Sequence, residues 1–163
     1  MARRNIVKEP DAVLHKQCRE VTKFDSRLHM LLDDLRDTLA TADGVGLAAP
    51  QVGVLRRVAI VLETNVEEGE PIPVIELVNP EVIEFEGEQE GAEGCLSSPG
   101  QYALVKRPMK VKVRAQNRFG ETFEVEGEGL TARCFCHEID HLSGIVFTDL
   151  SDEVFTEDEL EQE

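Results

Sequence analysis

Two histidines in the second half of the chain have the spacing of a metal site. His137 and His141 enclose the sequence H-E-I-D-H, and a separation of four residues places both imidazoles on one face of a helix. Glu138 lies between them, where a carboxylate beside a metal can take a proton from bound water. The alternative is an ordinary helix with two packed histidines, but imidazoles among apolar residues need polar partners. The motif therefore predicts a catalytic metal site.

A catalytic metal site of this kind needs a third protein ligand and one open coordination position. A third histidine six residues after His141 would indicate a metzincin, but Phe147 occupies that position. The glutamates further downstream lie in an acidic segment with little apolar sequence to hold them. Cys95, in the sequence E-G-C-L-S, is the better candidate, because a cation stabilises its thiolate. Two imidazoles and a thiolate suit zinc, nickel or cobalt.

The sequence G-V-G-L-A-A-P-Q at 44–51 contains the spacing G-x-G-x-x-A of a dinucleotide-binding turn. That turn must follow a strand, whereas this segment follows a predicted helix, so the dinucleotide interpretation is rejected. Its glycines instead allow the backbone to lie close against a ligand. Gln51 at its end offers a side-chain amide donor, with an ordinary surface residue as the alternative.

Hydrophobic periodicity predicts two helices. Leucines from Leu28 to Leu39 follow a helical period within 25–43, with Asp25 or Ser26 as the cap and Gly44 as the end. The helix predicted at 130–142 has little face left for solvent, so we expect it to lie between sheets. Its residues fall on separate lines. The metal-facing line holds Leu130, Cys134, His137 and His141, and a polar stripe facing away from the metal holds Arg133, Cys136 and Asp140.

Short alternating segments predict strands, and the clearest signal is a hairpin between Met109 and Gly127 that turns near Asn117–Gly120. Two further strands are predicted at Arg57–Glu63 and Pro73–Val78, joined by an acidic loop. The expected fold class is α+β, with antiparallel β-sheets packed around a central metal-binding helix and an N-terminal amphipathic helix. Residues 1–150 form one predicted catalytic domain, and residues 151–163 form an acidic C-terminal tail.

The chain is strongly acidic, with 17 basic and 33 acidic side chains and a formal net charge of −16. Such a surface repels phosphate backbones and anionic lipid, so direct nucleic-acid binding is not expected. The longest purely aliphatic segment, Val58–Leu62, is far shorter than the roughly 20 residues of a membrane-spanning helix. The N-terminal segment has no apolar run typical of a secretory signal. We therefore expect a cytoplasmic protein without membrane contact.

Three segments now stand in order along the chain: G-V-G-L-A-A-P-Q at 44–51, E-G-C-L-S at 93–97 and H-E-I-D-H at 137–141. Together they closely resemble the peptide deformylase family, and the similarity runs from about Val7 to Asp149. The resemblance implies removal of the N-formyl group from the initiator methionine of nascent polypeptides, with release of formate. It also implies one divalent metal ion, Fe²⁺ in the cell, with Zn²⁺, Ni²⁺ or Co²⁺ possible in purified protein.

The resemblance assigns roles residue by residue. Cys95, His137 and His141 are the implied metal ligands, and Glu138 is the general acid and base. The amide of Gln51 and the backbone N–H of Leu96 would stabilise the oxyanion. Two further groups would contact the N-formylmethionyl peptide. The backbone of Val45, Gly46 and Gly94 would pair with it as an added strand, and the side chains of Leu130, Arg133 and Cys134 would surround its methionine.

Two rival functions remain open from the sequence. A non-catalytic metal-binding module would explain the ligands, but it would not require Glu138. A related hydrolase could act on another small amide, such as a free formylated amino acid. Cys136 departs from the family pattern, because glutamine often precedes the H-E-x-x-H motif. The acidic tail argues against tight attachment to ribosomal RNA, so any association with the ribosome should be transient.

Overall fold

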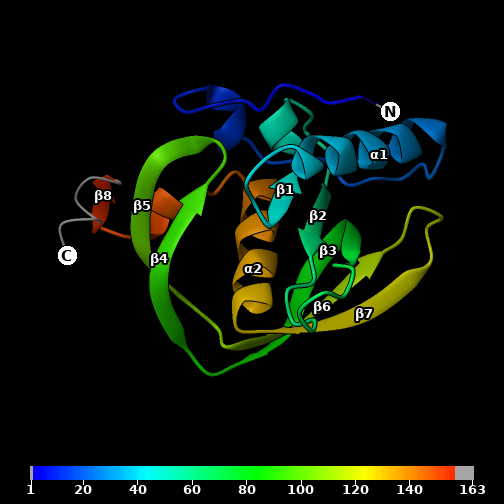
Figure 1. Ribbon diagram of the computed structural model, residues 1–163. Helices are drawn as coiled ribbons and strands as arrows, with labels where there is room; N and C mark the ends of the chain where they lie inside the picture. Colours follow the sequence, from blue (N-terminus) through cyan, green and yellow to red (C-terminus); the bar gives the residue numbers. More distant parts are fainter. Residues whose placement is uncertain (1, 157–163) are drawn as a thin grey trace.

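The computed structural model describes residues 2–156, and the fold has one helix held between two antiparallel sheets (Figure 1). This helix, α2 (Leu130–Leu142), begins and ends at the residues predicted from the sequence. A second helix, α1 (Ser26–Ala40), packs against the larger sheet. The arrangement confirms the predicted α+β class with a central helix. No helix within residues 2–156 is long and apolar enough to cross a membrane.

The sequence places α1 through its leucine stripe and its cap. Asp25 accepts a hydrogen bond from the backbone N–H of Leu28, which satisfies one of the free donors of the first turn. The leucines of the stripe are buried: Leu28, Leu31, Leu32, Leu35 and Leu39. The helix ends at Ala40, earlier than the predicted end at Gly44. Gly44 instead leaves room for the side chain of Leu96, which packs directly against its backbone.

The larger sheet has five strands in the order β1-β2-β3-β6-β7, all antiparallel. Their bounds are β1 (Gly46–Ala48), β2 (Val58–Leu62), β3 (Val74–Glu86), β6 (Lys110–Gln116) and β7 (Thr122–Glu128). The predicted hairpin is confirmed as β6 and β7. Its solvent face pairs Lys112 with Glu126 and Arg114 with Glu124, as the alternating charges indicated.

Strand β3 is much longer than the predicted strand at Pro73–Val78. Asn79 and Pro80 look like a strand end in the sequence, but here they form an irregularity inside the strand. Asn79 adopts a positive φ of 50°. Its side-chain amide bonds to the backbone N–H and C=O of Val21 and to Gln116. These bonds fix the loop that contains Val21, before α1, against the sheet. Pairing with β6 resumes at Glu81.

The smaller sheet has three strands in the order β4-β5-β8 and lies on the other side of α2 (Figure 1). These strands are β4 (Gln89–Cys95), β5 (Ser98–Arg107) and β8 (Val154–Thr156). The sequence had placed β8 in the acidic tail, but Phe155 pairs with Tyr102 of β5 and stacks on its ring. This contact extends the ordered fold beyond residue 150. The remainder of the predicted tail, 157–163, lies outside the described residues.

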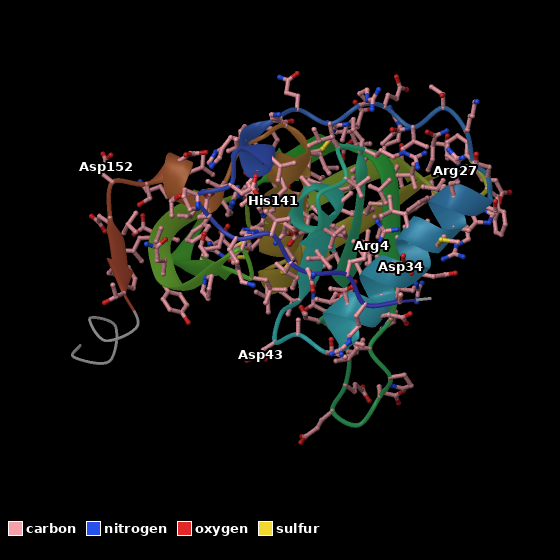
Figure 2. The ribbon with its side chains drawn as sticks, turned by 90° about the horizontal axis from the view of Figure 1, so that it is seen from above. Arg4, Arg27, Asp34, Asp43, His141 and Asp152 are labelled. Atoms are coloured by element: carbon pink, nitrogen blue, oxygen red, sulfur yellow. The ribbon has the colours of Figure 1, made fainter. Side chains whose placement is uncertain are left out.

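The N-terminal segment runs across the top of the molecule, from α1 toward the end of α2 that carries His141 (Figure 2). Arg4 donates to Asp34 of α1 at 2.9 Å. Further along, the backbone N–H of Cys18 bonds to the C=O of Leu142. The segment therefore connects the two helices.

Helix α2 is buried on nearly every side. Phe135 is completely buried, and it packs against Gly127 of β7 so closely that a Cβ at Gly127 would lie 2.6 Å from its ring. Cys136 also lies in the core cluster of α2 and the larger sheet. The stripe that the sequence suggested as polar is therefore covered by the sheets at Cys136.

Replacement of Gly127 by alanine should destabilise the protein by about 1–3 kcal/mol, because the added methyl group forces Phe135 out of its place. Denaturant unfolding of the wild type and Gly127→Ala would measure this change. Glu126→Ala, at the exposed neighbouring position, is the control and should change the free energy of unfolding by no more than about 0.5 kcal/mol. Equal effects of the two substitutions would contradict the packing argument.

Candidate metal centre and peptide cleft

Helix α2 carries two of the three predicted metal ligands and the predicted general base. His137 and His141 are one turn apart and are 7% and 0% exposed, and Glu138 is 4% exposed. Burial and the neighbouring His137 lower the pKa of His141 well below its usual value. A neutral imidazole has a free nitrogen lone pair, which is the form that binds a metal. The helix thus presents two ring nitrogens in one direction.

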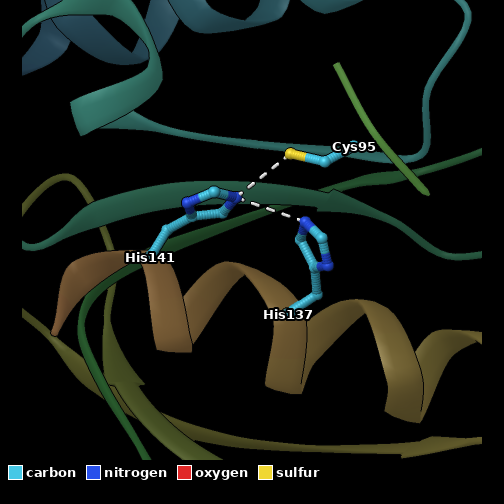
Figure 3. A group of neighbouring side chains, drawn as sticks. All are labelled: Cys95, His137 and His141. Carbon is cyan, nitrogen blue, oxygen red and sulfur yellow. Dashed lines mark hydrogen bonds between the residues drawn. The ribbon is translucent and has the colours of Figure 1, made fainter. Parts of the chain in front are cut away.

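Cys95 comes from the smaller sheet, at the end of β4. A two-residue turn, Leu96–Ser97, follows it and leads into β5. The Cys95 Sγ lies 3.4 Å from His141 Nε2, and His141 Nε2 lies 3.2 Å from His137 Nε2 (Figure 3). The three ligand atoms all lie within 4.8 Å of one another. The structure therefore brings together the predicted ligand set.

These separations fit a single metal ion. Typical metal–nitrogen and metal–sulfur bonds in a tetrahedral site place two nitrogens about 3.3 Å apart and nitrogen and sulfur about 3.5 Å apart. A further sign is the Oε1 atom of Glu138, which is buried and has no hydrogen-bond partner among the described residues. A buried carboxylate oxygen needs a donor, and a water molecule at the open position of a metal would supply one.

Glu138 is held against the backbone of β1. A Cβ at Gly46 would lie 2.6 Å from Glu138 Oε2, so only glycine leaves room for the carboxylate there. Burial raises the pKa of Glu138 to about 7. A carboxyl group with a pKa near neutrality can both accept and donate a proton in one reaction cycle. This is the property that a general acid and base requires.

Gln51 lies in a 3₁₀ turn (Ala49–Val52) directly after β1, and it is 1% exposed. Its Oε1 accepts from the backbone N–H of Ala48 at 3.0 Å, which fixes the orientation of the amide. Its Nε2 then points to the site, 3.5 Å from Cys95 Sγ and 3.2 Å from Ser97 Oγ. The surface-residue alternative for Gln51 is thereby excluded.

The N-terminal segment forms backbone hydrogen bonds with both walls of the site. The backbone N–H of Val7 donates to the C=O of Gln51 at 2.7 Å, and the N–H of Glu9 donates to the C=O of Ser97 at 2.8 Å. Gln51 belongs to the larger sheet's side of the site, and Ser97 belongs to the smaller sheet's turn. One extended segment therefore sets the distance between the amide donor and the turn that contains Leu96.

Sequence analysis missed the role of Glu93, which lies two residues before Cys95 on β4. Its Oε1 lies 2.6 Å from His137 Nδ1 and 2.6 Å from Arg107 Nη2, and its Oε2 accepts from Arg107 Nε at 3.1 Å. Arg107 also bonds Asp140 of α2 at 2.6 Å. Burial opposes the charge of Glu93, but the bonds from His137 and Arg107 lower its pKa to about 2. The strand period could have indicated this residue, because it places Glu93 and Cys95 on one face.

The metal centre opens into a cleft of about 410 Å³ between the two sheets. All six residues expected to contact a peptide line it: Val45, Gly46, Gly94, Leu130, Arg133 and Cys134. Burial raises the pKa of Cys134 to about 12, so its thiol is a neutral part of the wall. The sequence suggested that Arg133 lies on a polar stripe facing away from the metal. In the structure its guanidinium is buried and bonds Glu93 at 2.8 Å.

A larger hollow of about 660 Å³ lies over the ends of β3, β6 and β7, away from the metal ligands. Its lysines face glutamates on the neighbouring strands, with Lys112 3.5 Å from Glu84 and 3.7 Å from Glu126. The described residues that line it include no histidine or cysteine and none of the candidate metal ligands, so the smaller cleft is the candidate site.

Glu93→Gln retains the shape of the side chain but removes its charge, and it should destabilise the protein by about 3–5 kcal/mol near neutral pH, since a buried arginine loses its counter-charge. The pKa of Glu93 is about 2 in the fold against an ordinary value of 4.5. Its contribution is therefore complete above about 4.5 and is lost as the pH falls toward 2.

The difference in free energy of unfolding between the wild type and Glu93→Gln should therefore become smaller as the pH falls below about 4.5. Urea unfolding at a series of pH values, with a chelator present to exclude metal effects, would measure it. Glu124→Gln, which removes an exposed partner of Arg114, is the matched control and should cost less than about 1 kcal/mol. A gap that stays constant with pH would contradict the assignment.

Comparisons with known proteins agree with this geometry. The family model described as polypeptide deformylase matches residues 3–155. The peptide deformylase of Caldicellulosiruptor bescii is 51% identical over 162 residues, which cover 99% of this chain and 93% of that protein. Among solved structures, a peptide deformylase from Legionella pneumophila is 46% identical with a TM-score of 0.83, covering 91% of this chain and 86% of that one.

A second solved structure is a class I type b peptide deformylase from Acinetobacter baumannii with Met-Ala-Ser bound. It is 33% identical with a TM-score of 0.83, and the match covers 91% of this chain and 98% of that one. The family model spans nearly all of the described residues, and the relatives match over almost their whole length. The chain belongs to the polypeptide deformylase family.

Proposed function

We propose that this chain removes the N-formyl group from the initiator methionine of nascent polypeptides and that Cys95, His137, His141 and Glu138 form its catalytic centre. The observation that carries the proposal is the convergence of three metal-ligand atoms, a buried carboxylate and the Gln51 amide at one end of a cleft. The Acinetobacter baumannii relative binds Met-Ala-Ser, which is the peptide that deformylation of formyl-Met-Ala-Ser leaves behind.

The reaction adds water to the formyl carbon and then breaks the carbon–nitrogen bond, which yields formate and a free amine. A divalent ion held by the three ligands supplies a positive charge that lowers the pKa of water and polarises the formyl oxygen. Glu138 takes the proton from the attacking water and passes it to the departing amine nitrogen. The Gln51 Nε2 and the backbone N–H of Leu96 donate to the oxygen that becomes negative.

The peptide would lie between two unpaired strand edges. Strand β1 ends one side of the larger sheet, and β4 ends one side of the smaller sheet. Backbone groups of Val45 directly before β1, of Gly46 on β1 and of Gly94 on β4 would bond to the backbone of the substrate, a mode that does not depend on its sequence. Leu130, Cys134 and the aliphatic stem of Arg133 would surround the methionine side chain.

This mode of binding suits an enzyme that acts on many different new chains. Because its substrates are made in the cytoplasm, we place the enzyme there. Its strong negative charge disfavours tight docking on RNA, so contact with the ribosome would be transient.

The assay that tests the function is formate release from formyl-Met-Ala-Ser under anaerobic conditions, with formyl-Met and unformylated Met-Ala-Ser beside it. We expect release from the formylated peptide only. Glu138→Ala should retain its metal and lose at least about 10²-fold in kcat, because the proton carrier is gone. Release from formyl-Met alone would favour the hydrolase of free formylated amino acids. Metal binding without any release would favour the binding module.

We propose Fe²⁺ as the metal in the cell. A ferrous ion beside the Cys95 thiolate is open to oxidation of both partners, so the iron-loaded enzyme should lose activity on prolonged aeration. The zinc-loaded enzyme is the control, because zinc has no redox chemistry, and its activity should not change with air. Formate assays before and after aeration, with metal content measured each time, would compare the two. Full activity of aerated iron enzyme would contradict the proposal.

A further inference from the structure

Arg133 belongs both to the wall of the peptide cleft and to a buried ion-pair cluster. It lies on α2, one turn before the metal ligand His137, and its side chain is 10% exposed. It lines the peptide cleft together with Leu130 and Cys134. The guanidinium at the end of the same side chain is buried behind the cleft wall, between α2 and the smaller sheet.

The guanidinium is held by the smaller sheet. Its Nη1 donates to Glu93 Oε2 at 2.8 Å and to the backbone C=O of Val105 at 3.2 Å. Its Nη2 packs over β4, because a Cβ at Gly91 would lie only 3.3 Å from that nitrogen. A planar guanidinium with several fixed neighbours has one orientation, so movement of the side chain would be transmitted to its partners.

Glu93 links Arg133 to the metal ligand His137. One carboxylate oxygen, Oε2, accepts from Arg133, and the other, Oε1, lies 2.6 Å from His137 Nδ1. A bond at Nδ1 fixes the ring so that Nε2 faces the metal. Arg107 bonds both oxygens of Glu93 and also Asp140, so two cations face two anions in this cluster. Arg133 is therefore not the sole support of Glu93, but it is the one that reaches the cleft.

We propose that Arg133 is a positioning residue that couples occupation of the methionine pocket to the hold of His137 on the metal. A substrate side chain in the pocket excludes water from the arginine stem and strengthens its bond to Glu93. Glu93 then holds the His137 ring more firmly. By linkage, a bound metal must favour peptide binding by the same factor. The peptide half of this proposal rests on the proposed function, whereas the link from Arg133 to His137 does not.

The experiment measures the rate at which zinc-loaded protein loses its metal to a chelator, with and without the peptide Met-Ala-Ser. Arg133→Met retains a stem of similar length but removes the charge and the donors. Without peptide, this variant should lose zinc faster by up to about 10-fold, the lower end of the range for loss of a direct partner of a metal ligand, because Arg133 acts on His137 through Glu93. Met-Ala-Ser should slow zinc loss in the wild type and have a smaller effect in the variant.

Three comparison variants separate positioning from general damage. Leu130→Ala opens the same pocket without touching Glu93, so it should weaken the peptide effect and leave zinc loss without peptide unchanged. Arg114→Met removes an exposed arginine that pairs with Glu124, and it should change neither rate. Arg133→Lys restores the charge and should recover part of the zinc retention. In steady-state assays, Arg133→Met should lower kcat more than it raises KM.

Zinc loss from Arg133→Met at the wild-type rate would overturn the link to His137. An equal effect of Met-Ala-Ser on the wild type and the variant, or no effect on a wild type that releases formate, would overturn the coupling. Arg133→Gln carries the same test if the methionine variant does not fold. If the wild type releases no formate, the proposed function fails, and zinc loss without peptide still decides the role of Arg133.

Discussion

The structure of the site depends on one buried carboxylate, Glu93. It lies on β4 of the smaller sheet, facing α2, and it bonds a metal-ligand imidazole and two guanidinium groups. A carboxylate removed from water is costly unless its partners replace the lost hydration. Here Arg107 and Arg133 supply that replacement, so burial strengthens the bond to His137. The smaller sheet is thereby joined to α2 at the residue whose ring direction matters most for metal binding.

The other contacts bring separate parts of the chain to the same point. Cys95 comes from a turn of the smaller sheet, Gln51 from the end of β1, and the histidines from α2. None of these elements alone fixes the distance between thiolate, amide and imidazoles. The N-terminal segment does so from outside, because the backbone N–H groups of Val7 and Glu9 bond the C=O of Gln51 and the C=O of Ser97. The first residues of the chain thus contribute to the geometry of a site that they do not line.

The sequence predicted the local parts of this arrangement well and the long-range parts poorly. Helix α2 and the β6–β7 hairpin followed from periodicity within one segment. Strand β3 was predicted too short, because Asn79-Pro80 indicates a strand end unless the amide of Asn79 finds partners on Val21 and Gln116. Strands β4 and β5 lack a clear apolar alternation and form through pairing with each other. The bond from Arg133 to Glu93 was not predicted, since Glu93 lies 40 residues away on the smaller sheet.

The charges of the site explain why a divalent ion suits it. In the cluster behind His137, Arg107 and Arg133 are balanced by Glu93 and Asp140. In front of it, a bound metal would be coordinated by the thiolate form of Cys95 and the neutral forms of His137 and His141, with the carboxylate of Glu138 beside it. Two negative groups and one divalent cation sum to zero. Burial raises the pKa of Glu138 to about 7, and a divalent cation held by the three ligands would favour the ionised form that accepts a proton. Such an ion would therefore supply the charge that lowers the pKa of water and would also favour the form of Glu138 that can receive the proton.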